Sequence, residues 1–108
     1  MKIKKFLLVF IFPFLLSSQS SFSDESKMTK GLEIFNEVAG CAACHILKAA
    51  GSEGNIGPNL DTVEGLNYDS VMDIVTHGLG VMPAFGEDEI LTKEEIDIVS
   101  FYVSNSVN

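Results

Sequence analysis

The sequence is poor in positive charge. It contains 108 residues, with no tryptophan and no arginine. Beyond the basic N-terminus, four lysines at positions 27, 30, 48 and 93 stand against all 15 aspartates and glutamates, which gives 4 − 15 = −11. Such a surface repels nucleic acid and anionic membranes, although it also serves solubility alone. A protein partner is therefore expected to offer a basic docking patch, with an association that weakens as salt rises.

The sequence also lacks an apolar run long enough to cross a bilayer. Its longest run, Phe6 to Leu16, has 11 residues. As a helix it would cover about 16 Å, against roughly 30 Å of hydrocarbon. Three lysines precede the run, which is the pattern of a secretory signal peptide. We therefore expect export to the periplasm and no stable membrane insertion after cleavage. An uncleaved, loosely tethered form is the alternative.

Small residues favour cleavage of this signal peptide after Ser23 or after Ser20. In the first case the signal peptide is 1–23 and the mature domain is 24–108, which has 108 − 23 = 85 residues. A single domain of this size has a thin core, and such domains often depend on a disulfide, a metal or a cofactor.

The mature sequence shows no convincing alternation of apolar and polar residues typical of strands. Three helices are expected instead, over about 27–39, 68–77 and 93–104. Asp24 or Ser26 is expected to cap the first. Its apolar stripe is expected to comprise Met28, Leu32, Phe35 and Val38. The sequence thus predicts an all-α domain of three to five helices.

Both cysteines of the chain fall in one pentapeptide, Cys41-Ala42-Ala43-Cys44-His45. Two thiols at this spacing can add to the vinyl groups of a haem as thioethers, and the adjacent imidazole can bind the iron. Cys41 and Cys44 would tether the haem, and His45 would be its proximal ligand. The alternatives are a redox disulfide, half of a zinc site, or chance.

The rest of the chain is unfavourable for those alternatives. A thioredoxin-like oxidoreductase needs a strand before its Cys-X-X-Cys, and no strand is expected here. A zinc site needs four ligands, and beyond the pentapeptide only His77 and carboxylates remain. His77 lies at the end of the second expected helix, where the helix dipole favours a surface histidine.

The turn at 57–60, Gly-Pro-Asn-Leu, supplies a candidate partner for His45. A metal-bound histidine usually donates its second ring N–H to a carbonyl or carboxylate, and the Pro58 carbonyl could accept it. An ordinary Gly-Pro turn explains the same residues.

Met82 is the candidate for the other side of the iron. It precedes Pro83, so it lies on a stiff, non-helical segment, which suits a thioether ligand. Filling an apolar gap is the alternative, and is the role expected for Met28 and Met72.

In combination, these features resemble the class I cytochromes c over essentially the whole mature chain. Residues 30–35 are similar to the family's first helix, in which a glycine and an aromatic pack against an aromatic of the last helix, here Tyr102. The pentapeptide resembles the attachment site with His45 as proximal ligand, and Met82-Pro83 resembles the segment of the distal ligand.

The 57–60 turn is similar to the family loop in which the proline carbonyl, here of Pro58, receives the histidine N–H. In that loop a leucine, here Leu60, packs on the haem. The resemblance implies a small all-α domain wrapped around one covalently attached haem c and its iron.

The function implied is a periplasmic one-electron carrier that is not an enzyme. With His45 and Met82 both bound to iron, no position is left for a substrate. Its partners would be redox proteins. One alternative is a dedicated cytochrome subunit of a periplasmic dehydrogenase, for example one that oxidises sulfite or an alcohol. Another is a ligand-binding haem enzyme or sensor in which Met82 dissociates.

Overall fold

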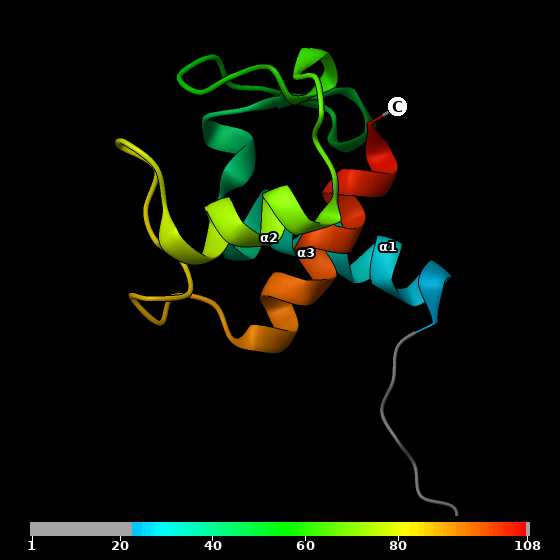
Figure 1. The fold of residues 1–108 in the computed structure, drawn as a ribbon. Coiled ribbons are helices and arrows are strands. Elements are labelled where there is room, and N and C mark those ends of the chain that lie inside the picture. Colours follow the sequence, from blue (N-terminus) through cyan, green and yellow to red (C-terminus); the bar gives the residue numbers. More distant parts are fainter. Residues whose placement is uncertain (1–22, 108) are drawn as a thin grey trace, which may run out of the picture.

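Helix α3 (Lys93–Ser106) is the central element of the fold, because α1 (Asp24–Glu33) and α2 (Tyr68–His77) both pack against it (Figure 1). The computed structural model describes residues 23–107. The expected signal peptide lies outside these residues, apart from its last one. Within the described part of the chain, no helix combines the length and the apolar character needed to cross a membrane.

Helix α1 begins earlier than the sequence indicates. Its N-cap is Ser23, whose side chain accepts a hydrogen bond from the backbone N–H of Ser26 at 3.1 Å. The expected caps, Asp24 and Ser26, are therefore wrong. Processing after Ser20 would keep this cap, whereas processing after Ser23 would remove it.

The end of α1 changes its winding. After Glu33 the chain continues as a π-helix, Ile34–Val38. Ile34 and Phe35 are buried, whereas Leu32 and Val38 are 37% and 46% exposed. The expected stripe is thus wrong at these two exposed positions. A π turn spaces its hydrogen bonds five residues apart, so the apolar positions no longer follow the α-helical period.

Gly31 lies where α1 crosses α3. A Cβ atom at this position would overlap the Cβ of Tyr102 and lie 3.2 Å from the carbonyl oxygen of Ile98. The rings of Phe35 and Tyr102 pack with their centroids 6.1 Å apart. The expected packing of a glycine and an aromatic of the first helix against Tyr102 is confirmed.

Helices α2 and α3 each begin with a capping box. Asn67 Oδ1 accepts from Ser70 N at 2.9 Å, and Ser70 Oγ accepts from Asn67 N at 3.0 Å. Thr92 and Glu95 make the same reciprocal pair at 3.1 and 2.9 Å. The expected bounds of α2 are confirmed, and α3 runs on to Ser106.

Short segments connect the π-helix to α2. They comprise three 3-10 turns and two strands: η2 (Cys41–Ala43), β1 (Ile46–Leu47), η3 (Lys48–Ala50), β2 (Ser52–Glu53) and η4 (Leu60–Thr62). The two strands pair in antiparallel fashion, which corrects the expectation of no strand. Strands of two residues are too short to show an alternating pattern. Apart from this ladder, the predicted helical class is confirmed.

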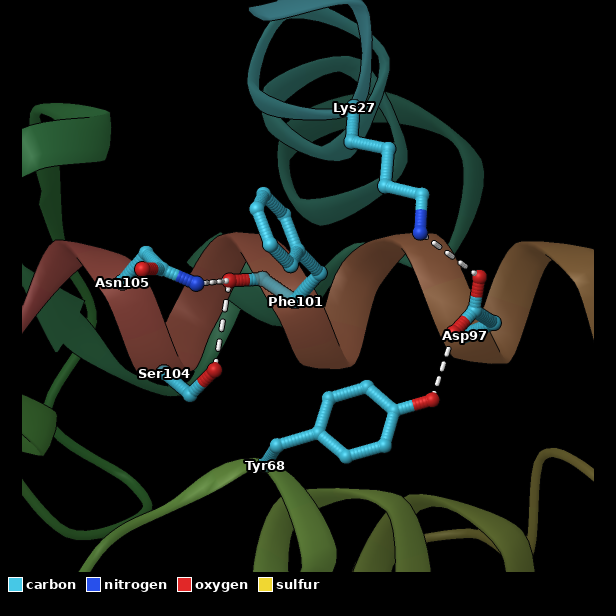
Figure 2. Close-up of polar contacts among 6 residues, drawn as sticks. All are labelled: Lys27, Tyr68, Asp97, Phe101, Ser104 and Asn105. Carbon is cyan, nitrogen blue, oxygen red and sulfur yellow. Dashed lines mark hydrogen bonds and ion pairs between the residues drawn. The ribbon is translucent and has the colours of Figure 1, made fainter. Parts of the chain in front are cut away.

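Asp97 on α3 joins all three helices (Figure 2). Its carboxylate lies 3.4 Å from Lys27 Nζ on α1 and accepts from the hydroxyl of Tyr68 on α2 at 2.5 Å. Lys27 Nζ also lies 5.2 Å from the centroid of the Phe101 ring. Burial and the hydrogen bond to Asp97 raise the pKa of Tyr68 to about 12. Polar contacts therefore supplement the apolar packing of α1 and α2 on α3.

Candidate functional site

A cavity of about 440 Å³ lies between α2, α3 and the loops that precede and follow α2. Its lining includes the π-helix, the Cys41–His45 segment, the 56–66 loop, α2, the 79–85 loop and α3. Most lining residues are aliphatic or aromatic, and none of them is an aspartate, a glutamate or a lysine. Such a volume is within the usual range for a bound organic ligand, about 300–1,000 Å³.

Cys41 and Cys44 stand at the wall of this cavity, on and directly after turn η2. Gly40, with a left-handed φ of 72°, turns the chain out of the π-helix and into η2. No disulfide joins the two sulfur atoms. Burial raises the pKa of the Cys41 thiol to about 11, whereas a redox-active Cys-X-X-Cys has a lowered thiol pKa. The thiol oxidoreductase alternative is therefore disfavoured.

His45 lines the cavity with one ring nitrogen engaged. Its Nδ1 lies 2.8 Å from the carbonyl oxygen of Pro58. A carbonyl can only accept, so Nδ1 carries the proton and Nε2 is left for a metal. The backbone of Gly57 packs directly on the imidazole, because a Cβ there would lie only 2.6 Å from His45 Cε1. Glycine at 57 permits this close approach.

The backbone of His45 is held by Ser52, a buried residue in β2 that the sequence analysis missed. Ser52 Oγ donates to the His45 carbonyl at 2.8 Å and accepts from Leu47 N at 2.9 Å. A serine in a glycine-rich stretch carries no local signal for such a contact, because loops are generally rich in serine.

Met82 lines the same cavity from the loop between α2 and α3. Gly78 ends α2 with a φ of 77°. Leu79 N then donates to the Met82 carbonyl at 3.2 Å, and Met82 N donates to the Leu79 carbonyl at 3.0 Å. This tight turn sets Met82 against the core, where it is partly buried. Met28 and Met72 also pack against the core, as expected.

The six site residues inferred from the sequence all line this one cavity: Cys41, Cys44, His45, Pro58, Leu60 and Met82. His77 does not line it; its exposed ring pairs with Glu87. Across residues 23–107, no three histidine, cysteine, aspartate or glutamate side chains converge as a metal cluster. A zinc site built from the pentapeptide and carboxylates therefore lacks its ligands.

The helical walls of the cavity are the functional residues that sequence reasoning did not assign. They include Phe35, Val71, Val75, Val99 and Val103, all buried. Their spacing marks them as apolar helix positions. The same spacing cannot distinguish contact with another helix from contact with a cofactor.

The donors around this cavity fit a haem c. Two thiols are available for thioether bonds, an imidazole nitrogen and a thioether sulfur are available for iron, and the apolar walls suit the macrocycle. The bound group would supply reversible one-electron chemistry at the iron, while the chain holds and shields it.

Comparison with known proteins agrees with this fit. Residues 26–103 match the family described as cytochrome C oxidase, cbb3-type, subunit III. The fold is similar to the crystal structure of the c-type cytochrome SorU from Sinorhizobium meliloti, with a TM-score of 0.70 and 45% sequence identity. That match covers 77% of this chain and 93% of the other. No curated protein sequence matches the chain.

Cytochromes c bind their haem covalently through a Cys-X-X-Cys-His motif, and Cys41, Cys44 and His45 have that spacing. The chain therefore belongs to the c-type cytochromes of the cbb3-type subunit III family, electron carriers with covalently bound haem c.

Proposed function

We propose that this cytochrome carries single electrons in the periplasm, with His45 and Met82 as the two axial ligands of its haem iron. The observation that carries the axial assignment is that both side chains line one cavity together with Cys41 and Cys44. With both axial positions taken, the iron can only cycle between its ferric and ferrous states. The chain would therefore not itself be an enzyme.

The residues around the two ligands support this role. The hydrogen bond from His45 Nδ1 to the Pro58 carbonyl, at 2.8 Å, would fix the ring and make Nε2 a stronger ligand. A thioether sulfur from Met82 would favour the ferrous state and raise the reduction potential. Leu60 would pack on the haem from the turn that also holds Pro58.

Exposed apolar residues at the cavity supply a contact surface for a redox partner. Ile56, Leu79 and Val81 line the cavity and are 70%, 69% and 91% exposed. Together with the acidic balance of the mature chain, they favour a partner with an apolar centre and basic groups around it. Such docking would be weak and short-lived, as electron-transfer encounters usually are.

The test is the mass and visible spectrum of the mature protein, made in a host that attaches haem covalently. We expect the mass of the cleaved polypeptide plus one haem, and a sulfur-to-iron charge-transfer band. Met82→Ala should abolish the band and lower the reduction potential. Met72→Ala is the matched control, because Met72 packs against the core from α2, and it should keep the band.

Two results would overturn the proposal. One is a wild-type protein without the charge-transfer band. The other is rapid binding of carbon monoxide or cyanide to the folded wild-type protein, with function intact in Met82→Ala. The second result would favour the ligand-binding enzyme or sensor.

A dedicated subunit of a larger redox enzyme is a second candidate, favoured by the family description, which is that of an oxidase subunit. The larger enzyme would then be, for example, a periplasmic dehydrogenase that oxidises sulfite or an alcohol. Co-purification with a larger enzyme, at salt high enough to remove electrostatic contacts, would support the subunit. Loss of every partner under those conditions would support the free carrier.

A further inference from the structure

The loop 78–86, which carries Met82, leaves and rejoins α2 at one place. Gly86 N and Glu87 N both donate to the carbonyl of Thr76, at 3.2 and 3.0 Å. Gly86 packs closely on the same residue, because a Cβ there would lie 2.9 Å from Thr76 Cγ2. The last turn of α2 is therefore the base of this loop.

The outer part of the loop faces solvent. Leu79 and Val81 are 69% and 91% exposed, and Gly78 starts the loop with a left-handed φ of 77°. Apolar burial therefore contributes little at these two exposed positions. Besides the packing of Met82 itself against the core, the contacts at the base are what hold the loop in place.

One ion pair spans this base. His77 is the last residue of α2, and its Nδ1 lies 2.6 Å from Oε2 of Glu87, the residue that follows the loop. The Nε2 atom of the same ring lies 3.7 Å from Asp73 Oδ1, one turn earlier in α2. The C-terminal end of a helix favours a protonated histidine. The two residues that flank the loop are thus joined through their side chains.

We propose that His77 and Glu87 are positioning residues for Met82, because their ion pair locks the base of the loop and limits how often it opens on the distal side of the haem. The proposal rests on the proposed function, since it takes Met82 as the distal ligand. It assigns a role to His77, which lies outside the cavity.

The ion pair between His77 and Glu87 depends on pH, because it needs a protonated His77. In the described part of the chain, the charged groups that face the ring are Glu87, after the loop, and Asp73, on α2. The hydrogen bond to Glu87, followed by the charges of Glu87 and Asp73, raises the pKa of His77. The protonated ring that the pair needs is therefore fully present below the ordinary histidine value of about 6.5. It is lost as the pH rises through the raised pKa.

The experiment is the rate of cyanide binding to the ferric holoprotein, because Met82 must leave the iron before cyanide can bind. We expect Glu87→Gln and His77→Gln to bind cyanide about two- to five-fold faster than wild type at about pH 6, the range that an exposed ion pair supports. The double variant should be no faster than either single variant, because the two residues form one interaction. These differences should become smaller above the pKa of His77, where the ring loses its charge and at most a neutral hydrogen bond to Glu87 remains.

Asp88→Asn is the matched control. Asp88 is exposed and adjacent to Glu87, so its substitution removes the same charge without touching the pair, and the cyanide rate should stay at the wild-type value. Equal rates for wild type and Glu87→Gln at about pH 6, or an equal acceleration by Asp88→Asn, would overturn the lock. A wild-type charge-transfer band that Met82→Ala removes would, in either case, leave the proposed function intact. A wild type without the band would remove both proposals.

Discussion

At the scale of single residues, Gly31 on α1 and Ser100 on α3 have opposite expected effects on stability when either is replaced by alanine. Because Gly31 has no side chain, the backbones of α1 and α3 can approach closely at this point. Ser100 is fully buried on α3, and its Oγ finds no hydrogen-bond partner among residues 23–107. An alanine substitution at each position therefore tests whether tertiary packing or intrinsic helix propensity decides the stability there.

Gly31→Ala should lower the free energy of unfolding by about 1–3 kcal/mol, because the new methyl group would force the helices apart. The Cβ of Tyr102, which it would overlap, is fixed to the backbone of α3 and cannot rotate away. Urea unfolding of the holoprotein measures the change. Thr29→Ala, on an exposed position of the same helix, should stay within about 0.5 kcal/mol. If helix propensity alone decided, Gly31→Ala would instead gain about 1 kcal/mol, and that gain would contradict the packing.

Ser100→Ala should raise the free energy of unfolding by about 1 kcal/mol, because it removes a buried hydroxyl that has lost its hydrogen bonds to water. Thermal unfolding of the holoprotein is the measurement. Ser104→Ala is the control on the same helix, since Ser104 Oγ donates to the Phe101 carbonyl at 3.2 Å (Figure 2). If Ser104→Ala raised the free energy of unfolding as much as Ser100→Ala, helix propensity would be the cause.

At the scale of elements, Asp97 couples α1 and α2 to α3 and makes this coupling sensitive to alkaline pH. The pKa of Tyr68 is raised to about 12 in the folded protein by burial and by the hydrogen bond to Asp97. Its contribution to stability is therefore fully present below the ordinary tyrosine value of about 10, and is lost as the pH rises through the raised value.

Tyr68→Phe should be less stable than wild type at neutral pH, by about 1 kcal/mol for the lost hydrogen bond. The difference in the free energy of unfolding should become smaller as the pH rises above about 10, because only the wild type has a Tyr68 hydroxyl whose stabilising contribution is lost there. Urea unfolding of both proteins over this range is the measurement. The lysines titrate in the same range in both proteins, so the difference isolates Tyr68. A constant difference up to about pH 11 would contradict the assignment.

At the scale of the whole molecule, the apolar cavity makes the fold depend on its cofactor. The cavity has a volume of about 440 Å³, and its walls include buried residues of the core such as Phe35, Val99 and Val103. Without a bound group these apolar walls would face water, which is unfavourable for a domain of marginal stability, about 5–15 kcal/mol. The haem therefore supplies a large part of the core.

A variant with both Cys41→Ser and Cys44→Ser, which cannot attach haem covalently, should be largely unfolded when it is purified without haem. Far-ultraviolet circular dichroism and the cooperativity of urea unfolding are the measurements, with the holoprotein as control. A haem-free variant that unfolds cooperatively, with the helical content of the holoprotein, would contradict this dependence.

Features that lie close together in the chain could be predicted from the sequence. The pentapeptide at 41–45 identifies the cofactor because its thiols and imidazole are neighbours in the chain. The capping box at Thr92 and the end of α2 at Gly78 could also be predicted, because helix caps depend on residues within one turn. The π turn after Glu33 was missed, since a one-residue change of winding leaves no compositional signal.

The tertiary structure decided which distant segments meet. It brings Met82 to the cavity that His45 lines. It also pairs His45 Nδ1 with the Pro58 carbonyl, and the His45 carbonyl with the hydroxyl of Ser52. It also pairs His77 with Glu87 across the base of the Met82 loop. Sequence alone determined the cofactor and the helical class, because both rest on local chemistry. The shape of the site depends on side chains packed from α2, α3 and the loops, and no local pattern encodes that packing.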